Sequence, residues 1–460
     1  MKRIFIFLLL ALAHLSIPLF ASEKPSVIII VADDLGYGDV GFHGSDIETP
    51  NLDRLANEGA RLEAFYSCPM CSPTRAGLMT GRYPIRYGLM RAVVPPQRDY
   101  GLDVEEETLA DVFAKAGYEH RGIVGKWHLG HRRLEWFPTR RGFTFFVGCL
   151  NGAIDYFTLE RDGELDWHRN EDPYPQEGYA TDLIGDAAVE FIESVPDDEP
   201  YLLYLPFNAP HSPFQAKEED LAKYPHREGR KRTLAAMVDS MDQAIGRVFD
   251  AAESRSDWDN TFILFFSDNG GVNNVGDNGE LRGSKLTPYQ GGIRVAAAAY
   301  WKNGGIVGGK RIAEHMGYID VLPTMRRIIG AEDAPKKPLD GIDVLDAMKG
   351  QASLPTRSWF TYHDQNDNRV QRLAVNRGKF KLVGHVPAPD SEGGEAKWEL
   401  FEIWNDPNEK LEVSARNPES FDKLKKELES FLELRRDDQI IRFRIGAQDT
   451  PALPQWTPNR

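Results

Sequence analysis

Cysteine, basic charge and long apolar runs are all scarce in this sequence. Only three cysteines, Cys68, Cys71 and Cys149, occur among 460 residues, too few for a disulfide-stabilised scaffold. Lysine and arginine number 55 against 70 aspartate and glutamate residues, so the formal net charge is −15. This balance disfavours extended binding to nucleic acid or to an anionic membrane surface. An anionic substrate would therefore require positive charge to be concentrated in one place.

The long apolar run lies at the N-terminus, from Ile4 to Phe20. Met1-Lys2-Arg3 precedes it and Ala21-Ser22 follows, which is the order of a secretory signal. We expect residues 1–21 to be a signal peptide cleaved near Ala21, with export to the periplasm or the medium. A retained membrane anchor is the alternative, but His14 and Pro18 interrupt a run that is short for a membrane span. Three thiols in an oxidising compartment leave three possibilities: one pair with a free thiol, a chemically altered cysteine, or buried inert thiols.

The order of apolar patterns predicts an α/β fold. Short β-branched or aromatic runs at 27–31, 122–125, 201–205 and 261–266 alternate with amphipathic helical patterns at 105–116, 181–194, 234–252 and 420–434. This alternation favours a large, mostly parallel sheet sandwiched by helices. After Gly330 the pattern changes to prolines and then alternating strands, which suit a smaller antiparallel sheet with a closing helix. We therefore expect a catalytic domain at 22–354 and a C-terminal subdomain at 355–460.

Polar residues follow each predicted parallel strand, and those residues meet at one edge if the sheet is parallel. The four strands run into Asp33-Asp34, Lys126-Trp127-His128, Asn208-Ala209-Pro210-His211 and Ser267-Asp268-Asn269-Gly270. Three carboxylates and one amide oxygen form a hard-oxygen set that suits calcium or magnesium rather than zinc. Either motif alone is also ordinary turn chemistry, but the two together at two strand ends favour a metal site.

The segment Cys71-Ser72-Pro73-Thr74-Arg75 predicts a helix N-terminus. Pro73 suits the first turn of a helix, so Cys71 would lie just before backbone N–H groups that stabilise anions. Arg75 is close enough to add a guanidinium. From the residues alone, this is a cysteine-bearing loop before a helix, or at most a reactive thiol.

That segment, continued by Leu78 and Thr80-Gly81-Arg82, resembles the signature of the type I sulfatases of the alkaline phosphatase superfamily. Thr74 stands where the family more often has serine. Of the two neighbouring cysteines, Cys68 is not followed by Pro and Arg at the spacing that the family motif requires. The resemblance covers about Pro25 to Leu345, and the run from Gly125 to Phe143 is most similar to the arylsulfatase B branch and its bacterial relatives. Further matching blocks, in family order, begin at Ala32, Thr49, Gly125, Asn208, Ser267, Leu281 and Gly291.

The resemblance implies an alkaline phosphatase-like fold and a role for each motif residue. Cys71 would be oxidised to Cα-formylglycine by a formylglycine-generating maturation enzyme and would attack the sulfur of a sulfate ester, giving a covalent sulfo-enzyme intermediate. One calcium ion would be held by Asp33, Asp34, Cys71, Asp268 and Asn269. Arg75 would stabilise the nucleophile, and Lys126 and Lys285 would grip the sulfate. His211 would bind substrate and protonate the departing alcohol, and His128 would take a proton to release sulfate, roles that suit an ordinary histidine pKa near 6.5.

Other noticeable residues have simpler interpretations. Trp127 is expected to pack beneath the site, Arg82 and Arg294 to form structural pairs, and Cys149 to be a buried thiol. A polar, aromatic stretch could stack sugar rings or could equally be solvated loop. Its members are Asn151, Asp155, Tyr156, Trp167 and His168.

Three functions follow as hypotheses. The first is an exported, calcium-dependent sulfatase that acts on a sulfated polysaccharide or its oligosaccharides, with no nucleic acid or membrane partner. The second is a phosphoesterase or phosphonate hydrolase of the same superfamily, disfavoured because Asn269 occupies a place where those enzymes often carry histidine. The third is a non-catalytic glycan-binding relative, disfavoured because the reactive residues are all present.

Overall fold

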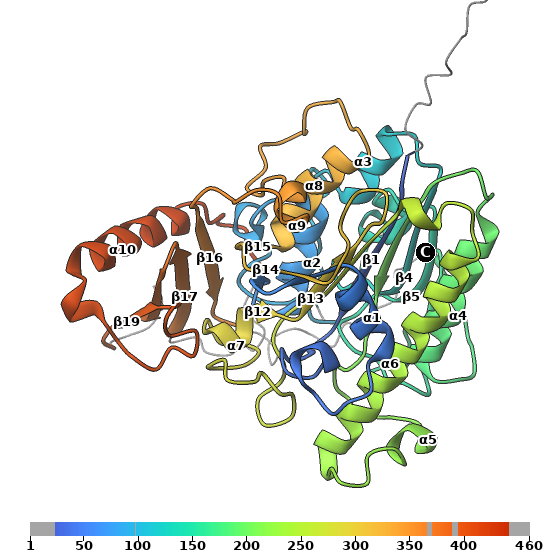
Figure 1. Cartoon of the computed structure of the whole chain (residues 1–460), viewed down its shortest axis with the longest axis horizontal. Helices are drawn as coiled ribbons and strands as arrows, with labels where there is room; N and C mark the ends of the chain where they lie inside the picture. Colours follow the sequence, from blue (N-terminus) through green and yellow to red (C-terminus); the bar gives the residue numbers. More distant parts are fainter. Residues whose placement is uncertain (1–23, 97, 366–369, 389–393, 441–460) are drawn as a thin grey trace, which may run out of the picture.

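The computed structural model of the chain describes residues 24–96, 98–365, 370–388 and 394–440 (Figure 1). The predicted signal peptide lies outside these residues. Within them, no helix combines the length and the apolar character that crossing a membrane requires.

A ten-stranded mixed sheet forms the centre of the larger body, and its middle strands β11, β1, β10, β4 and β5 are parallel. In spatial order the strands are β14 (Lys310–Ile312), β2 (Ala60–Leu62), β13 (Ala297–Tyr300), β11 (Thr261–Ser267), β1 (Ser26–Ala32), β10 (Tyr201–Pro206), β4 (His120–Lys126), β5 (Phe145–Cys149), β8 (His168–Arg169) and β9 (Asp172–Pro173). Two smaller sheets comprise β12 (Arg294–Val295), β3 (Phe65–Tyr66) and β15 (Met316–Gly317), and β6 (Glu160–Arg161) with β7 (Glu164–Leu165).

Helices cover both faces of the large sheet, as Figure 1 shows. Alternate residues of β1 separate two apolar cores: Val27, Ile29 and Val31 face one, and Ile28 and Ile30 face the other. The first core packs against α2 (Cys71–Thr80), α3 (Leu109–Lys115) and α8 (Val321–Ile328), and the second against α1 (Pro50–Glu58), α4 (Ala180–Ser194) and α6 (Gly229–Glu253). Shorter helices are α5 (Glu218–Leu221), α7 (Gln290–Ile293) and α9 (Leu345–Met348). The predicted α/β class with a mostly parallel central sheet is confirmed.

Helix α3 begins later than the sequence pattern predicts. We expected a helix from Glu105, but the first helical residue is Leu109. The Thr108 side chain accepts a hydrogen bond from the N–H of Asp111, and the Asp111 carboxylate accepts from the N–H of Thr108. This capping box starts the helix at Leu109, because it satisfies N–H groups at the helix start that have no carbonyl acceptor within the helix.

A second body at one end of the molecule is built from the C-terminal part of the chain (Figure 1). Its antiparallel sheet contains β16 (Ser358–His363), β17 (Val370–Arg377), β18 (Phe380–Pro387) and β19 (Lys397–Glu402) in sequence order, and α10 (Pro418–Leu432) packs against it. The predicted antiparallel sheet with a closing helix is therefore present. The division of the chain near Pro355 stays a prediction.

Candidate active site

The register of two neighbouring strands brings the acidic motifs together. β1 and β11 are parallel, with Ala32 opposite Ser267, so Asp33-Asp34 and Asp268-Asn269 leave the sheet side by side. The Asp268 N–H donates to the carbonyl of Ala32 at 2.9 Å, and the Asp34 N–H donates to Asp268 Oδ1 at 3.3 Å. Asn269 Nδ2 donates to Asp34 Oδ1 at 2.8 Å. The sequence prediction that these residues meet at one sheet edge is confirmed.

Cys71 is the first residue of α2 rather than the residue before it, and Met70 is the N-cap. Pro73 lies in the first turn, where its missing N–H costs no hydrogen bond. The Cys71 side chain is buried against Met70, Val93 and Leu286. Its sulfur and carboxylate oxygens of Asp33 and Asp268 all lie within 4.8 Å of one another.

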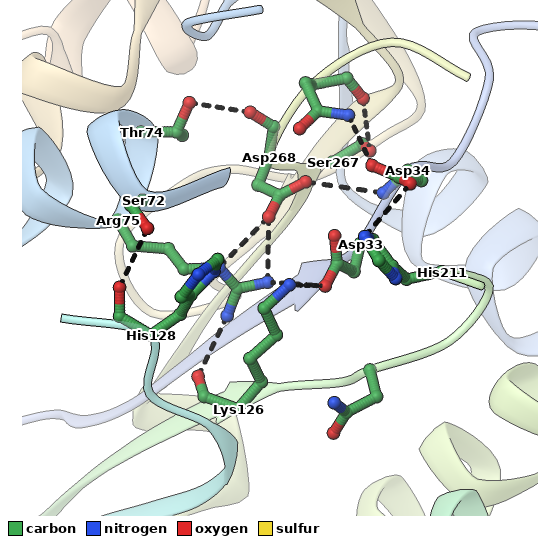
Figure 2. Close-up of polar contacts among 12 residues, drawn as sticks. Asp33, Asp34, Ser72, Thr74, Arg75, Lys126, His128, His211, Ser267 and Asp268 are labelled. Carbon is green, nitrogen blue, oxygen red and sulfur yellow. Dashed lines mark hydrogen bonds and ion pairs between the residues drawn. The ribbon is translucent and has the colours of Figure 1, made fainter. Parts of the chain in front are cut away.

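Three cationic side chains balance the three carboxylates. Arg75 donates to Asp268 Oδ2 from Nε at 3.0 Å and from Nη2 at 2.8 Å, while its Nη1 donates to the carbonyl of Lys126 at 2.9 Å (Figure 2). Lys126 Nζ contacts Asp33 Oδ2, and Lys285 Nζ lies 2.6 Å from Asp34 Oδ1. Arg75 and Lys126 have no exposed side-chain surface. Charged side chains that are buried this close together are stable only when each is paired with an opposite charge.

Two oxygens of this cluster lack a hydrogen-bond partner among the described residues. They are Asp33 Oδ1 and Asn269 Oδ1, and both are buried. Buried polar atoms are normally satisfied, so unpaired oxygens beside crowded carboxylates suit a hard cation. Burial and repulsion from Asp33 raise the pKa of Asp268 to about 7, against the lowering effect of Arg75. The donor set therefore fits one calcium-type ion, which would relieve this repulsion.

Hydrogen bonds to backbone carbonyls define the free nitrogen of each histidine. His128 Nε2 lies 2.9 Å from the carbonyl of Val94, and His211 Nδ1 lies 2.5 Å from the carbonyl of Ser212. A carbonyl only accepts, so these nitrogens carry protons. The lone pairs remain on His128 Nδ1, which is buried without a hydrogen-bond partner in the described chain, and on His211 Nε2, 3.6 Å from Asp34 Oδ2.

Neither histidine keeps the ordinary pKa on which the sequence argument relied. Burial, followed by the charge of Lys126, holds the pKa of His128 well below its usual value. Burial and then Lys285 lower the pKa of His211 to about 4. Local sequence could not reveal this, because burial, the main cause in both, and the approach of Lys285 to His211 are set by the fold.

The thiol of Cys71 is a poor nucleophile as it stands. Burial raises its pKa, although Lys126 and Lys285 act in the opposite direction. A raised pKa leaves the thiol protonated near neutral pH, whereas the thiolate is the reactive form. The hypothesis of a simple reactive thiol therefore loses support.

Two hydroxyl groups of the motif hold the site together in ways that the sequence did not indicate. Thr74 Oγ1 accepts from the N–H of Cys68 at 2.9 Å and donates to the carbonyl of Asp268 at 2.6 Å. Ser72 Oγ donates to the carbonyl of His128 at 2.9 Å and accepts from the N–H of Val94 at 3.1 Å. Both residues belong to the motif that resembles the sulfatase signature, but only their hydrogen bonds in the structure show that they hold the site together.

A glycine packs directly against the His128 ring. A Cβ atom on Gly152 would lie 2.3 Å from His128 Cε1, too close for any side chain. Sequence reasoning missed Gly152, and nothing in its local pattern could have identified it.

The remaining sequence expectations have mixed outcomes. Tyr156, Trp167 and His168 are buried, so they form neither a surface on which sugar rings stack nor a solvated loop; Asn151 is buried too, and Asp155 is partly buried. Tyr156 instead donates to the carbonyls of Asn208 at 2.7 Å and His211 at 2.9 Å, which supports the His211 loop from the interior.

The expected structural roles are confirmed. Trp127 is buried, Arg82 pairs with Glu106 at 3.1 Å, and Arg294 Nε donates to the carbonyl of Glu63 at 2.7 Å. Cys68, Cys71 and Cys149 are all buried and unpaired with one another.

Comparisons with known proteins agree with this geometry. Residues 25–331 match the family described as Sulfatase. The chain is similar to arylsulfatase J of Mus musculus, with 31% identity over 486 residues that cover 95% of this chain and 79% of that protein. N-acetylgalactosamine-6-sulfatase of Mus musculus is 33% identical over 391 residues, covering 78% of this chain and 72% of that protein.

The similarity extends to a solved structure. The crystal structure of Ps i-CgsB in complex with k-i-k-neocarrahexaose has a TM-score of 0.84 to this chain and 29% sequence identity. The match covers 93% of this chain and 96% of that one, so it includes the C-terminal sheet as well as the larger body.

Proposed function

Because the chain belongs to the sulfatase family of the alkaline phosphatase superfamily, and is therefore a sulfuric ester hydrolase, we propose that it removes sulfate from sulfated saccharides with calcium and a formylglycine made from Cys71. The observation that carries this proposal is the placement of Cys71 Sγ within 4.8 Å of the Asp33 and Asp268 carboxylates, at a helix N-terminus. A thiol would not be needed there for packing alone.

One calcium ion would be held by Asp33, Asp34, Asp268 and Asn269, with residue 71 completing its shell. When bound, it would supply positive charge to a sulfate oxygen and to the nucleophile. The unpartnered oxygens of Asp33 and Asn269 support this assignment, as does the crowding of three carboxylates. Because three cationic side chains already balance those carboxylates, a divalent cation can enter together with a singly charged sulfate ester and a deprotonated hydroxyl of residue 71 without leaving net charge buried.

The modified Cys71 would supply the nucleophile. Its hydrated aldehyde carries two hydroxyl groups on one carbon, one to attack sulfur and one whose later deprotonation expels sulfate and restores the aldehyde. Position 71 suits this role because first-turn N–H groups of α2 favour negative charge there. Arg75 stabilises the same region through its fixed pair with Asp268.

The remaining charged side chains would bind and orient the sulfate. Lys126 pairs with Asp33 and Lys285 pairs with Asp34, so each lysine lies at a different carboxylate of the cluster. From these positions their ammonium groups can contact separate sulfate oxygens and stabilise charge that moves toward the bridging oxygen.

The two histidines would move the protons. His211 is fixed through Nδ1, and its Nε2 beside Asp34 would have to take up a proton before it could pass one to the departing alcohol oxygen. The charge of Asp34 favours that protonated form. His128 is fixed through Nε2, which leaves the lone pair of Nδ1 to accept a proton when sulfate is released. Because each ring is fixed through one nitrogen, the other nitrogen of each ring is available for a proton transfer.

A sulfated polysaccharide or its oligosaccharides is the proposed substrate class. N-acetylgalactosamine-6-sulfatase is among the similar proteins, and the similar solved structure holds a neocarrahexaose. The proposed export, directed by residues 1–21, would bring the enzyme to such substrates in the periplasm or the medium. A formylglycine-generating maturation enzyme would be its required partner.

Mass spectrometry of the peptide containing Cys71 tests the modification. The protein is produced with a formylglycine-generating enzyme, and the peptide is expected to have lost H₂S and gained one oxygen relative to the cysteine form. Calcium-supplemented protein should then hydrolyse an aryl sulfate, and Cys71→Ala protein should fold normally without turnover. Full activity in Cys71→Ala protein would refute the mechanism.

Hydrolysis of a phosphate ester of the same aryl alcohol distinguishes a sulfatase from a phosphoesterase. Faster release from the phosphate than from the sulfate would favour a phosphoesterase. A two-metal phosphatase would need further Asp and His ligands, and Asn269 stands where such enzymes often carry histidine. Sulfate specificity is therefore the expected result.

A further inference from the structure

Lys285, which pairs with Asp34 in the active site, belongs to a closed loop that leads into α7. The N–H of Gly291 donates to the carbonyl of Arg282 at 2.7 Å and so joins the two ends of this loop. We call residues 282–291 the lysine loop. Because the loop is short and its ends are joined, the position of those ends determines where Lys285 lies.

The larger body holds the middle of the lysine loop. The N–H of Lys285 donates to the carbonyl of Gly271 at 3.0 Å. The N–H of Leu286 donates to the carbonyl of Pro69, also at 3.0 Å. Leu286 has a left-handed backbone conformation, with φ of 65°. Such a conformation is costly for leucine and persists where the surrounding structure enforces it. The lysine loop therefore depends on its neighbours to keep its shape.

The C-terminal body holds both ends of the lysine loop through one residue, Glu409. Glu409 follows β19 in the chain and is buried. Its Oε2 accepts from the N–H of Gln290 at 2.7 Å, and its carbonyl oxygen accepts from Arg282 Nη1 at 3.1 Å. Figure 1 shows α7, which begins at Gln290, on the side of the larger body that is next to the C-terminal sheet.

Arg282 has a carboxylate partner other than Glu409. Its Nη2 lies 3.2 Å from Glu399 Oε1, and its guanidinium lies 3.9 Å from the ring centroid of Tyr289. The Tyr289 hydroxyl donates to Glu399 Oε2 at 2.5 Å. Because Glu399 neutralises Arg282, the carboxylate of Glu409 needs a cation of its own.

A buried lysine supplies that cation. Lys381 of β18 has its Nζ 2.7 Å from Glu409 Oε1, and neither side chain has exposed surface. Neither of these two atoms makes a hydrogen bond to another group among the described residues. Burial lowers the pKa of Lys381, against the opposite effect of Glu409. A buried ion pair is costly to desolvate and is weak evidence for stability, so stability alone does not explain this pair.

We propose that Glu409 and Lys381 are positioning residues for Lys285. Lys381 holds the carboxylate of Glu409, and Glu409 holds both ends of the lysine loop, so that the ammonium group of Lys285 stays where it would contact a sulfate oxygen. This inference rests on the proposed function, in which Lys285 binds the sulfate. It gives the C-terminal body a part in the reaction that Glu409 performs through the lysine loop, without touching the substrate.

Lys381→Met/Glu409→Ala protein tests the proposal, because it removes the acceptor for Gln290 without leaving an unpaired buried charge. We expect kcat/KM for an aryl sulfate to fall about tenfold in the full-length enzyme, since a displaced charged group loses much of its effect. Lys381→Met/Glu409→Gln protein keeps an oxygen that can accept from Gln290, and its kcat/KM should be close to that of the wild type. Equal losses in the two double variants, or no loss in either, would overturn the inference.

Leu428→Ala controls for a general loss of stability in the C-terminal body. Leu428 is a buried residue of α10 and takes no part in the contacts of the lysine loop described above. The substitution should lower the melting temperature, because it leaves a cavity, but kcat/KM should be unchanged at a temperature where the variant is folded. A tenfold loss of kcat/KM in Leu428→Ala protein would contradict the inference, because general loosening would then explain both results.

Binding of inorganic sulfate shows whether Glu409 acts through Lys285. Titration calorimetry on calcium-supplemented protein compares the wild type, Lys285→Ala, Lys381→Met/Glu409→Ala and the triple variant. We expect Lys285→Ala and the triple variant to bind sulfate equally weakly, because a positioning residue has no effect once the residue it positions is gone. A further loss of affinity in the triple variant would overturn the inference.

The two proposals fail in different ways. A wild type that hydrolyses no aryl sulfate would contradict the proposed function, whereas the series of sulfate affinities would still decide the inference. Sulfate affinity that is unchanged in Lys285→Ala protein would overturn the role of Lys285, and the positioning role of Glu409 with it.

Discussion

Single buried hydrogen-bonding groups hold the reacting side chains of this sulfatase in position. Asp34 and His128 both adopt left-handed backbone conformations, with φ of 66° and 57°. Such conformations are costly for residues other than glycine and persist where surrounding contacts enforce them. The contacts of Thr74 and of Gly152 are two examples, and each can be tested by its own substitution.

Thr74→Val is expected to destabilise the protein by about 1–3 kcal/mol, because the N–H of Cys68 and the carbonyl of Asp268 would lose a buried partner. Urea denaturation measures the change. Thr74→Ser keeps the hydroxyl and is the control, with stability and turnover close to those of the wild type. A loss in Thr74→Ser with none in Thr74→Val would show that the methyl group, rather than the hydroxyl, matters.

Gly152→Ala is expected to lower kcat by about tenfold or more, since a misplaced catalytic group loses most of its effect. The new methyl group would meet the His128 ring 2.3 Å away, and a shifted ring cannot keep its bond to Val94. Aryl sulfate kinetics with the melting temperature recorded alongside test this. Unchanged kcat in a stably folded variant would remove His128 from the reaction.

Whole segments, and not only side chains, set the shape of the site. The register of β1 with β11 aligns the carboxylates, and the segment from Arg91 to Val94 joins the His128 ring to the C-terminal sheet. This segment is a mechanical link between the two bodies, because it is hydrogen-bonded to both.

Gln365→Leu is expected to reduce kcat for an aryl sulfate several-fold with a smaller change in KM. The substitution leaves the N–H of Val93 without its acceptor, which loosens the carbonyl of Val94 that orients His128. Gln365→Glu retains an acceptor oxygen and should behave like the wild type. Identical kinetics in all three proteins would show that the segment holds its place without the C-terminal sheet.

At the scale of the whole molecule, calcium should stabilise the folded chain. An ion bound only by the native state raises stability by about 2.7 kcal/mol at a concentration one hundred times its dissociation constant. Thermal denaturation in calcium and in excess chelator should therefore give a higher melting temperature with calcium, and turnover should stop in chelator.

Asn269→Ala tests whether this effect arises at the proposed site. It removes one unpartnered oxygen, so the calcium-dependent rise in melting temperature should shrink. A melting temperature that is the same with calcium and with chelator in the wild type would contradict the metal assignment.

The sequence by itself determined the alternation of strands and helices, the smaller C-terminal sheet and the polar residues at the strand ends. Periodicity and strand-end chemistry are local properties, and the motif around Cys71 is contiguous, so both can be read along the chain. The start of α3 departed from the pattern because the capping box at Thr108, also local, was overlooked.

Only the tertiary structure decided which of those residues are buried and what they face. The burial that lowers the pKa of His128 and His211, the approach of Lys285 to His211, and the interior position of Tyr156 and Trp167 all depend on residues far apart in sequence. Desolvation and long-range charge arise from three-dimensional packing, and strand register decides which side chains become neighbours. For that reason no local pattern could have placed Gly152 against the His128 ring.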